Sequence, residues 1–574
     1  MNTRYSSTYR QLNRLAPFLL AVFALYRFIG LGFGELQQWD EAIYALRTLH
    51  VLHFDQIFYQ HGAMLHGIYY AGHPPLYVWL SSFWVSIFGD VTWAYRITSA
   101  LAVAAAVPAL YFFVRKHATV YHGLLAAGFL AFAPLPTFYS RQGQLNVLLM
   151  LLMLCVFLAY DSSRFQRYQK LLLAGICLGL ALMTKFLHAL SIPAAMAVAG
   201  VLLYNRSGRR YLTDAATILI ISLPIWLPWV IGFQMNFGDG EFVLTSSAMP
   251  FGKVAGGDEG TDKVLGKLFY ANQLVVQLSV LFPYFILGWW DALRQRREGI
   301  GFLLAVFLAG YVAVLHLMSS AFTVYLLPLF PYLLFLGVQG LRRLPALSVA
   351  KKTVFVIASL CSGLWALSLD LREAVKAFVQ MLISGAPALD SQVLMAAAVL
   401  ILLLTAVATA LLLRERSHLT LAVAPKFFTV FVAALALTTM VRIWRLDPLL
   451  YYDGIEPVAS QISKLGDIDL ISIGDGDNPQ LNYYLYKYLG MPGSIDEMYY
   501  TRLEPSFLGT QAVADSVEAR SQRYPSFILV ETDEIRHGRY SSPEDVLPET
   551  EEVILTTKRY AMFVILGGSS CRTK

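Results

Sequence analysis

The chain has 574 residues, of which 57% are hydrophobic and 14% are charged, and its formal net charge is +6. About a quarter of a soluble domain's residues are charged, so this composition excludes a chain made only of soluble domains. Long apolar runs recur, and each membrane crossing needs about 20 apolar residues. Bands of basic residues separate these runs, so topology explains the positive charge better than nucleic-acid binding does.

The basic bands predict the sidedness of the chain, because Lys and Arg concentrate in cytoplasmic loops. Placing every band in the cytoplasm gives about thirteen membrane helices between residues 1 and 443. The predicted spans lie near 16–34, 96–114, 120–138, 146–161, 170–186, 188–204, 214–234, 269–290, 300–318, 321–338, 352–369, 393–413 and 424–443. Segment 74–89 is then a juxtamembrane helix, and loops 35–95 and 235–268 lie on the outer face.

The tail, residues 444–574, differs in charge from the membrane part, with 20 acidic and 12 basic residues. DLISIGDG, YPSFILVE and YAMFVILGG are typical of strands, and PQLNYYLYKYLG is typical of a helix ending at Gly490. We therefore expect a small soluble α/β domain outside the membrane. The cysteines show neither a disulfide framework nor metal-ligand spacing.

Candidate functional residues begin in loop 35–95, where GELQQWDEAIYALRTL places Asp40 and Glu41 side by side at a membrane surface. Asp40 has two interpretations: it caps an amphipathic helix, or it takes part in chemistry. His73 starts the run His-Pro-Pro, a rigid beginning for the juxtamembrane helix whatever else the imidazole does.

Three cations are predicted near the outer ends of spans. Arg141 and Lys185 lie in outer turns, and Arg96 lies at the outer end of its span. Arg141 is either an interfacial residue that extends toward water or a ligand for an anion. Lys185 lies in an apolar stretch, where a cation needs an anionic partner or a watery cavity. The Gly-rich loop 235–268 is either a mobile lid or a plain disordered loop.

The chain resembles the GT-C superfamily of polyprenyl-phosphate-sugar-dependent glycosyltransferases. The nearest branch contains protein O-mannosyltransferase-like and lipid A aminoarabinose transferase-like enzymes. The resemblance covers about residues 35 to 331 and rests on six motifs in order: WDEAIYA, GHPPLYVWL, YRITSAL, SRQGQLNVLL, GLALMTK and VYLLPLFP. Each motif is weak alone, but their order is specific. The branch often has Asp where Asn146 stands and Arg where Val324 stands.

The resemblance implies an inverting sugar transfer from a polyprenyl phosphate to a lipid, glycan or protein of the cell envelope. Asp40 would accept or orient the acceptor's proton, with Glu41 supporting it. His73, Arg96, Arg141, Lys185 and Tyr325 would bind the substrate, and the cations would stabilise the leaving phosphate. The implied location is the plasma membrane, with the active site and the tail outside the cytoplasm.

Two other classes of function stay open. A transporter or flippase for lipids or lipid-linked sugars also has many helices and intramembrane cations. A non-catalytic protein that binds lipid-linked sugar would tolerate Asn146 in place of Asp. The sequence indicates no cofactor, leaves a divalent metal ion open, and predicts the lipid bilayer but no nucleic acid as a partner.

Overall fold

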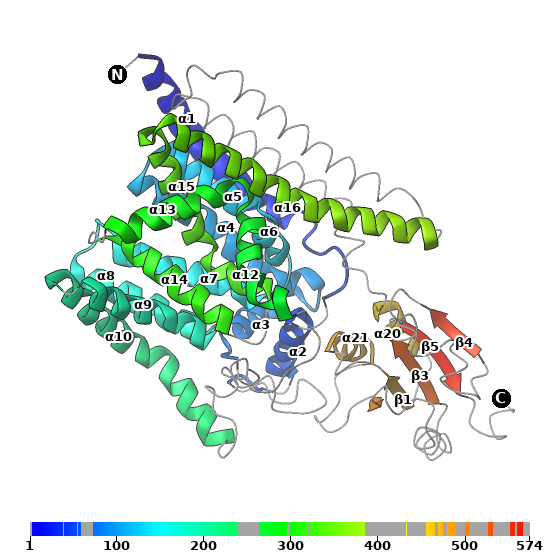
Figure 1. The fold of residues 1–574 in the computed structure, drawn as a ribbon. Coiled ribbons are helices and arrows are strands. Elements are labelled where there is room, and N and C mark those ends of the chain that lie inside the picture. Colours follow the sequence, from blue (N-terminus) through cyan, green and yellow to red (C-terminus); the bar gives the residue numbers. More distant parts are fainter. Residues whose placement is uncertain are drawn as a thin grey trace, which may run out of the picture. The chain divides into compact units, whose positions relative to one another are not determined.

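The computed structural model describes most of the chain up to residue 384 and several segments of the tail (Figure 1). The described residues are 3–37, 40–53, 55–58, 73–203, 205–237, 263–295, 299–317, 322–384, 432, 455–464, 469–473, 479–489, 500–503, 526–531, 552–556 and 560–565. The chain divides into two compact units, described here one at a time. Unit 1 is Met1–Leu31, Gly72–Tyr77 and Arg96–Leu446, and unit 2 is Gly32–Ala71, Val78–Tyr95 and Asp447–Lys574.

In the described part of unit 1, all regular secondary structure is helical. Its first half contains α1 (Thr3–Leu25), η1 (Tyr26–Phe28), most of α4 (Thr92–His117), α5 (Val120–Phe132), α6 (Pro134–Ser140), α7 (Leu145–Asp161), α8 (Arg167–Leu182), α9 (Phe186–Leu203) and α10 (Arg206–Phe237). Its second half contains α12 (Lys263–Leu278), η4 (Ser279–Leu281), α13 (Phe282–Gln295), α14 (Ile300–Leu317), η5 (Thr323–Leu329), α15 (Phe330–Arg343), η6 (Leu344–Ala346) and α16 (Val349–Ser384).

One predicted span is broken. Instead of a single helix over 120–138, α5 ends at Phe132, and α6 starts at Pro134 with a bend of 55° between them. Pro134 has no N–H, and its ring clashes with the preceding turn, so the chain bends before it and Pro134 takes the first position of the new helix. The bend sets the direction in which the chain leaves α6 at Arg141.

Small residues allow several helices of unit 1 to approach closely. A Cβ added to Gly288 in α13 would lie 2.0 Å from the carbonyl oxygen of Leu336 in α15. On α8, a Cβ at Gly175 would lie 2.5 Å from the Ile221 side chain of α10. Close backbone approach of this kind is typical of helix packing in membranes.

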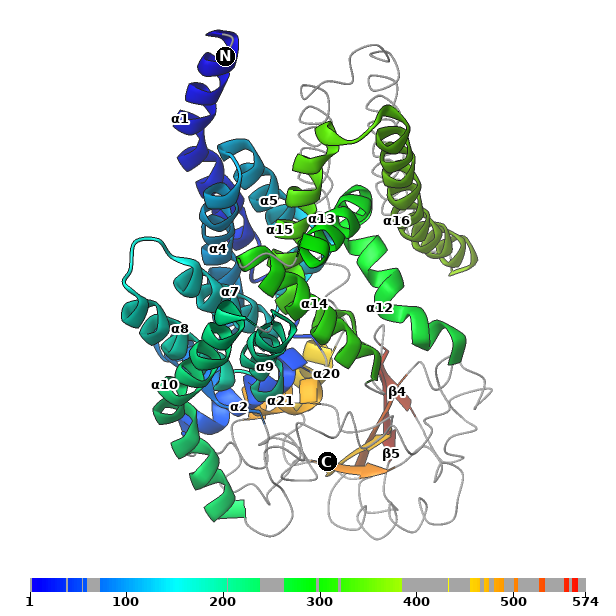
Figure 2. The same cartoon turned by 60° about the vertical axis from the view of Figure 1, so that its left-hand side comes forward.

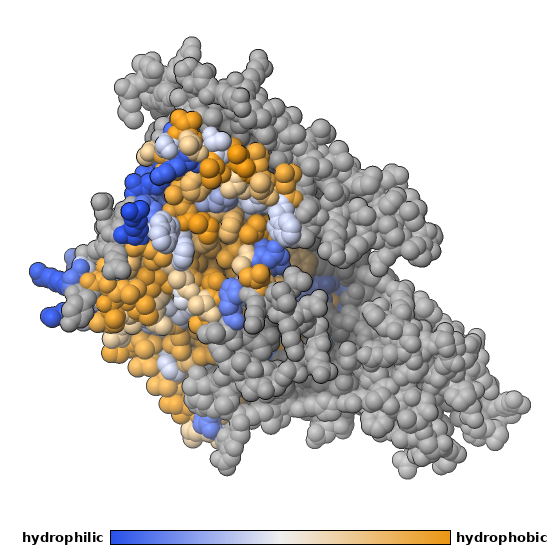
Figure 3. All heavy atoms as spheres, viewed as in Figure 1, coloured by the Kyte–Doolittle hydropathy of each residue, from blue (hydrophilic) through white to orange (hydrophobic). Residues whose placement is uncertain are grey.

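Six helices in the described ranges are long and apolar enough to cross a membrane, or seven if the bent α5–α6 pair is one span. α7 and α14 are apolar but shorter, and Figure 3 shows mostly hydrophobic side chains on the described part of one face of unit 1. The chain is therefore a multi-pass helical membrane protein. The thirteen-span arrangement stays a prediction, because 393–413 and nearly all of 424–443 lie outside the described residues.

Unit 2 joins segments from both ends of the chain. It contains α2 (Asp40–His53), most of α3 (Leu76–Phe88), α20 (Ile455–Ile462) and α21 (Pro479–Leu489). It also contains β1 (Asp469–Ile473), β2 (Tyr500–Leu503), β3 (Ser526–Glu531), β4 (Glu552–Thr556) and β5 (Tyr560–Ile565).

The strands form one five-stranded sheet in the order β2-β1-β3-β5-β4. β1 is parallel to β2 and β3, and β5 is antiparallel to β3 and β4. α21 lies between β1 and β2 in the sequence and provides the crossover that two parallel strands require. Figure 2 shows α21 beside α2, within the same unit.

Candidate active site

Lys185 lies in the short turn between α8 and α9, which belongs to unit 1. Its ammonium nitrogen is 3.2 Å from the amide oxygen of Asn146, at the start of α7. The same nitrogen lies 4.4 Å from the centre of the Tyr325 ring, which η5 contributes. An amide oxygen and an aromatic face both interact favourably with an ammonium group, and neither carries a formal negative charge. The positive charge of Lys185 is thus oriented by neutral groups from two other elements.

His73 approaches the same turn from the segment before α3. The N–H of Leu76 donates a hydrogen bond of 3.1 Å to the carbonyl of Met183 in this turn, and Pro74 and Pro75 are buried. His188, one helical turn after Lys185, interacts electrostatically with both His73 and Lys185. The structure therefore brings His73 and Lys185 together, as a site for an anion requires.

His188 was not among the predicted site residues. Its ring lies 5.4 Å from the ring of Tyr325 and 5.8 Å from that of Tyr311, measured between centroids. Spacing alone could have indicated it, since residues three apart share one face of a helix. We refer to His73, Asn146, Lys185, His188 and Tyr325 as the cation cluster.

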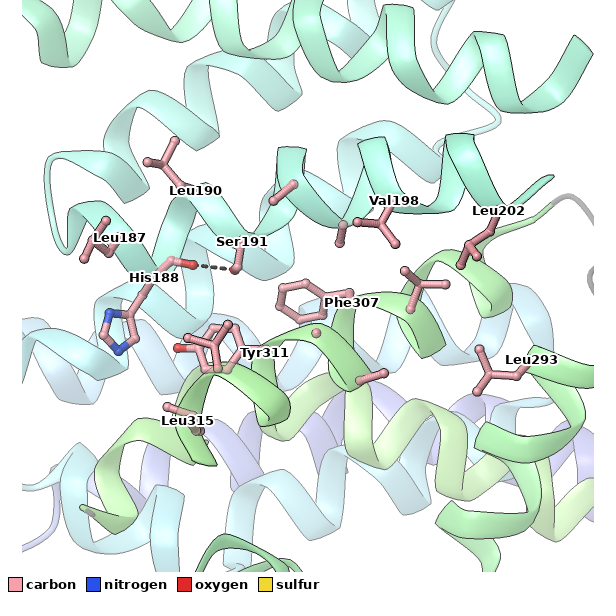
Figure 4. Close-up of a pocket in the computed structure, with 16 residues that line it drawn as sticks. Leu187, His188, Leu190, Ser191, Val198, Leu202, Leu293, Phe307, Tyr311 and Leu315 are labelled. Carbon is pink, nitrogen blue, oxygen red and sulfur yellow. Dashed lines mark hydrogen bonds between the residues drawn. The ribbon is translucent and has the colours of Figure 1, made fainter. Parts of the chain in front are cut away.

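An apolar pocket of about 560 Å³ starts beside the cation cluster. Figure 4 shows α9 on one side of this pocket and α14 on the other, with His188 and Tyr311 near one end and Leu202 and Leu293 near the other. Nearly all other side chains along it are apolar. Because His188 also contacts Tyr325, the polar end of the pocket adjoins the cation cluster.

Arg141 and Arg96 lie elsewhere in unit 1 and contact backbone. Arg141 follows α6, is 2% exposed, and donates to the carbonyls of Ile29 at 2.7 Å, Gly30 at 2.8 Å and Arg27 at 3.3 Å. Arg96 is 1% exposed and donates to the carbonyl of Leu31 at 3.1 Å. Gly30 has φ +64°, a conformation that favours glycine. Both arginines thus brace segment 27–31, which follows α1.

The acidic pair belongs to unit 2. Asp40 is the first residue of α2 and is exposed, so its carboxylate reaches solvent near a helix N-terminus, where negative charge is favourable. Glu41 is 2% exposed, and its carboxylate accepts a 2.6 Å hydrogen bond from the N–H of Gln37. The two neighbouring carboxylates therefore differ: Glu41 fastens the start of the helix, and Asp40 faces outward.

The tail holds the residues that precede the acidic pair. The N–H of Leu36 donates to the hydroxyl of Tyr484 at 2.9 Å, and the carbonyl of Leu36 accepts from the side-chain amide of Gln480 at 2.7 Å. Both partners come from α21. Glu35 accepts a 2.9 Å hydrogen bond from the N–H of Glu456 at the start of α20. We call these three contacts the tail clamp.

A second contact of α21 involves Asp90, whose carboxylate accepts from the hydroxyls of Tyr95 at 2.6 Å and Tyr483 at 2.7 Å. Burial raises the pKa of Tyr483 well above its usual value, and the nearby negative charge adds to that rise. The Tyr483 hydroxyl thus stays protonated and keeps donating across the physiological range. Two hydroxyl donors compensate a carboxylate that faces the interior of unit 2.

The seven predicted site residues fall into three groups. His73, Lys185 and Tyr325 belong to the cation cluster, Arg96 and Arg141 brace segment 27–31, and Asp40 and Glu41 start α2 in unit 2. Within the described ranges, no three His, Cys, Asp or Glu side chains are placed to hold a metal ion. The loop 235–268 was predicted to be a lid, and residues 238–262 of it lie outside the described residues.

The chain is similar to known proteins over part of its sequence. A family model described as dolichyl-phosphate-mannose-protein mannosyltransferase matches residues 72–231. The chain is 25% identical over 226 residues to an undecaprenyl phosphate-alpha-4-amino-4-deoxy-L-arabinose arabinosyl transferase of Pseudomonas savastanoi pv. phaseolicola, covering 38% of this chain and 42% of that protein. It is 26% identical over 282 residues to arabinosyl transferase 1 of Pseudomonas fluorescens, covering 47% and 48%. The chain thus spans less than half the length of these relatives.

The likeness in fold extends over nearly the whole chain. The apo crystal structure of ArnT from Cupriavidus metallidurans matches with a TM-score of 0.67 and 16% identity, over 97% of this chain and 99% of that one. The same protein bound to undecaprenyl phosphate matches with a TM-score of 0.66 and 16% identity, over 96% and 99%. The motifs, the partial family match and the fold together make the chain similar to ArnT and to other membrane glycosyltransferases of the GT-C type.

Proposed function

We propose that the protein is an inverting glycosyltransferase that moves a sugar from a polyprenyl phosphate to a cell-envelope acceptor at the outer face of the plasma membrane. The observation that carries this proposal is the cation cluster at the end of an apolar pocket. A polyprenyl phosphate has the matching chemistry, because it joins one anionic group to a long apolar chain. The relatives from Pseudomonas are named for undecaprenyl phosphate sugars, which makes undecaprenyl phosphate the first donor to test.

The leaving phosphate gains negative charge as its bond to the sugar breaks. Lys185, with His73 beside it, would stabilise that charge in a site with little water, where a fixed cation has its largest effect. Asn146 and Tyr325 hold the ammonium group without neutralising it. The pocket between α9 and α14 would take the part of the polyprenyl chain nearest the phosphate.

The acceptor oxygen would attack the anomeric carbon from the face opposite the phosphate, which inverts the configuration. Asp40 would accept the proton from an acceptor hydroxyl, a task that suits an exposed carboxylate. Glu41 would keep Asp40 in place through its hydrogen bond to Gln37. Arg141 and Arg96 would contribute by bracing segment 27–31.

The outer-face location follows from the basic clusters. If these clusters are cytoplasmic, the Lys185 turn, the start of α2 and the tail from residue 444 are outside, and the chain crosses the membrane about thirteen times. The acidic tail would then form an extracytoplasmic α/β domain. We expect a reporter enzyme that works only outside the cytoplasm to be active when it is fused after Lys574. Activity of a fused reporter that works only in the cytoplasm would contradict this topology.

The catalytic proposal can be tested with purified protein, undecaprenyl phosphate sugars and an extract of envelope acceptors. Asp40→Asn keeps the size of the side chain but removes the base, so we expect turnover to fall about 10²–10⁴-fold while donor binding persists. Asp55→Asn is the matched control, because Asp55 is also an exposed carboxylate, just beyond α2. Asn caps helices about as well as Asp does, so wild-type turnover in Asp40→Asn with a defect only in Asp40→Ala would reduce Asp40 to a helix cap.

The same assay separates the other classes of function. A transporter or a protein that only binds lipid-linked sugar would retain the donor but release no sugar to any acceptor. Donor binding without transfer by the wild-type protein, across the sugars and acceptors supplied, would therefore contradict the proposal.

A further inference from the structure

A second, polar pocket lies at the other end of α8 from Lys185. It has a volume of about 170 Å³ and is formed where α7 ends and where α8, α10 and α14 begin. Its charged lining residues are Asp161, Arg167, Lys170, Arg210 and Asp214. All four helices belong to unit 1. The proposed sugar transfer assigns no role to this pocket.

Asp214 is the buried carboxylate of this pocket. It is 1% exposed and accepts from Arg167 at 2.6 Å and from the Tyr160 hydroxyl at 2.9 Å. Arg210 lies further away, 3.7 Å from the same carboxylate. A buried carboxylate with these partners orients Arg167 at the mouth of the pocket, whereas the long contact of Arg210 constrains its guanidinium much less.

The side chains that line the pocket carry a net positive charge. Three cations line it against two carboxylates, and Asp161 also pairs with Lys116 and His117 outside the pocket. Lys170 lies in the first turn of α8, and Ser207 lies in the first turn of α10. Helix N-termini carry partial positive charge, so two of them add to the field of the side chains. The pocket therefore suits a small anion such as a phosphate group.

Apolar side chains beside the pocket indicate where the rest of such a ligand would lie. On α8, Tyr168 is 63% exposed and Leu172 is 47% exposed. Both residues adjoin the charged lining in sequence and face outward on a helix of a membrane protein. In Figure 3, hydrophilic side chains gather near the ends of α8 and α10 and hydrophobic ones continue along the described face. A headgroup in the pocket would thus place acyl chains against apolar surface.

We propose that this pocket binds the phosphate headgroup of an anionic phospholipid. Arg167, Lys170 and Arg210 contact the phosphate oxygens, and the acyl chains run along Tyr168 and Leu172. Basic pockets between membrane helices are suited to anionic headgroups. The zwitterionic headgroup of phosphatidylcholine is a poorer match, because its choline cation offsets the phosphate charge and would be repelled by the three basic side chains. By the sidedness that the basic clusters predict, the lipid belongs to the cytoplasmic leaflet, opposite to the proposed sugar transfer.

The test uses the full-length protein in neutral detergent and measures its melting temperature while lipid is added. Dioleoylphosphatidylglycerol should raise the melting temperature at lower concentrations than dioleoylphosphatidylcholine, because a ligand stabilises the state that binds it. Lys170→Gln and Arg210→Gln should each weaken the apparent affinity for phosphatidylglycerol about five-fold, the usual effect of one cation near an anionic headgroup. Lys170→Arg keeps the charge and should behave like the wild type.

Arg209→Gln is the matched control, because Arg209 is an exposed arginine next to Arg210 that does not line the pocket. An equal loss of affinity in Arg209→Gln and Arg210→Gln would mean that diffuse surface charge attracts the lipid and would overturn the proposal. Equal stabilisation by the two lipids would overturn it as well. If inorganic phosphate or glycerol phosphate stabilises the protein as strongly as phosphatidylglycerol, the pocket is a site for free phosphate and not for a lipid.

Discussion

Arg141 and Lys185 both follow an apolar helix of unit 1, and the sequence predicts the same task for both cations. Their surroundings differ. Arg141 is buried and donates to three backbone carbonyls of a segment more than 100 residues away, whereas Lys185 is half-buried beside a side-chain amide and an aromatic ring. A guanidinium that moves away leaves three carbonyl acceptors without this donor, one of them buried. An ammonium that moves between neutral side chains leaves fewer groups without a partner.

The partners of a cation are therefore more informative than its position at a helix end. The contacts of Arg141 favour a structural role, and those of Lys185 favour binding of an anion that arrives and leaves. The donor-binding role of Arg141 stays a prediction. Substitutions at the two turns can separate the roles, because a structural cation should affect stability first and a binding cation should affect the donor first.

The largest effect is expected from Arg141→Ala, which removes the donors to one buried carbonyl and two partly buried ones. We expect the free energy of unfolding to fall by roughly 2–3 kcal/mol, since a buried acceptor left without a partner costs about 1–3 kcal/mol and a partly buried one costs less. A lower melting temperature in detergent would show this loss. Arg141→Lys retains the charge but not the fork that reaches several carbonyls, so it should lie between the wild type and Arg141→Ala. If Arg141→Ala has normal stability but no longer binds the donor, Arg141 is a binding residue and its assignment as a structural residue is wrong.

Lys185→Ala should come next, with a loss of about 10²-fold in turnover and weaker donor binding, the scale for removing one group that stabilises developing charge. The melting temperature without donor should change little, because the side chain is only half-buried. Lys351→Ala serves as the control, since Lys351 is exposed on α16. A fall in stability as large as that of Arg141→Ala would place both cations in the same structural class.

Asn146→Asp should have a smaller effect, about ten-fold weaker donor binding. The new carboxylate would lie close to the ammonium of Lys185, which is 3.2 Å from the present amide oxygen, and would compete with the donor phosphate for it. Asn205→Asp is the control, because Asn205 is exposed. Faster transfer in Asn146→Asp would instead indicate a second carboxylate role, as the Asp common in related sequences implies.

The sequence predicted those parts of the fold that depend on local pattern. Apolar runs predicted α7, α9 and α14 within a few residues, and the alternation in the tail predicted the positions of β1, α21, β3 and β5. The span predicted at 16–34 was wrong in its bounds, since α1 is Thr3–Leu25 and its first turns are polar. The break at Pro134 was missed because both sides of it are equally apolar, although proline gives a local reason for it.

Contacts between distant residues could not be predicted from such patterns. Asn146 was noted as a missing acid, and only the fold shows that its amide contacts Lys185. The backbone of Leu36 binds side chains of α21, one of them 448 residues later in the chain. No periodicity or spacing signals a hydrogen bond of that kind. The predicted site residues were thus found as motifs, while their partners required the structure.

The smallest effect is expected at the tail clamp, whose side chains have a structural role and do not contact the substrate in the proposed reaction. Gln480→Ala removes the donor to the Leu36 carbonyl, and Tyr484→Phe removes the acceptor for its N–H. Gln37 is the next residue, and its N–H donates to Glu41. If Leu36 loses its hydrogen bonds to α21, the backbone before α2 should move more, and Asp40 and Glu41 should be held less firmly. We expect turnover to fall about three- to ten-fold while donor binding stays normal, because a small displacement from the reactive geometry slows the reaction without weakening binding of the donor.

A double-mutant cycle makes this last expectation specific. If the clamp acts through Glu41, its loss should matter less once Glu41→Gln has already weakened the link to Gln37, so the two effects on turnover should not add. Lys464→Gln is the control in the tail, because Lys464 is exposed just beyond α20 and makes none of the three contacts of the tail clamp. Additive effects of Gln480→Ala and Glu41→Gln, or a loss of donor binding equal to the loss of turnover, would mean that α21 stabilises unit 2 in general. Non-additive effects confined to turnover would mean that the tail sets the position of the two carboxylates at the start of α2.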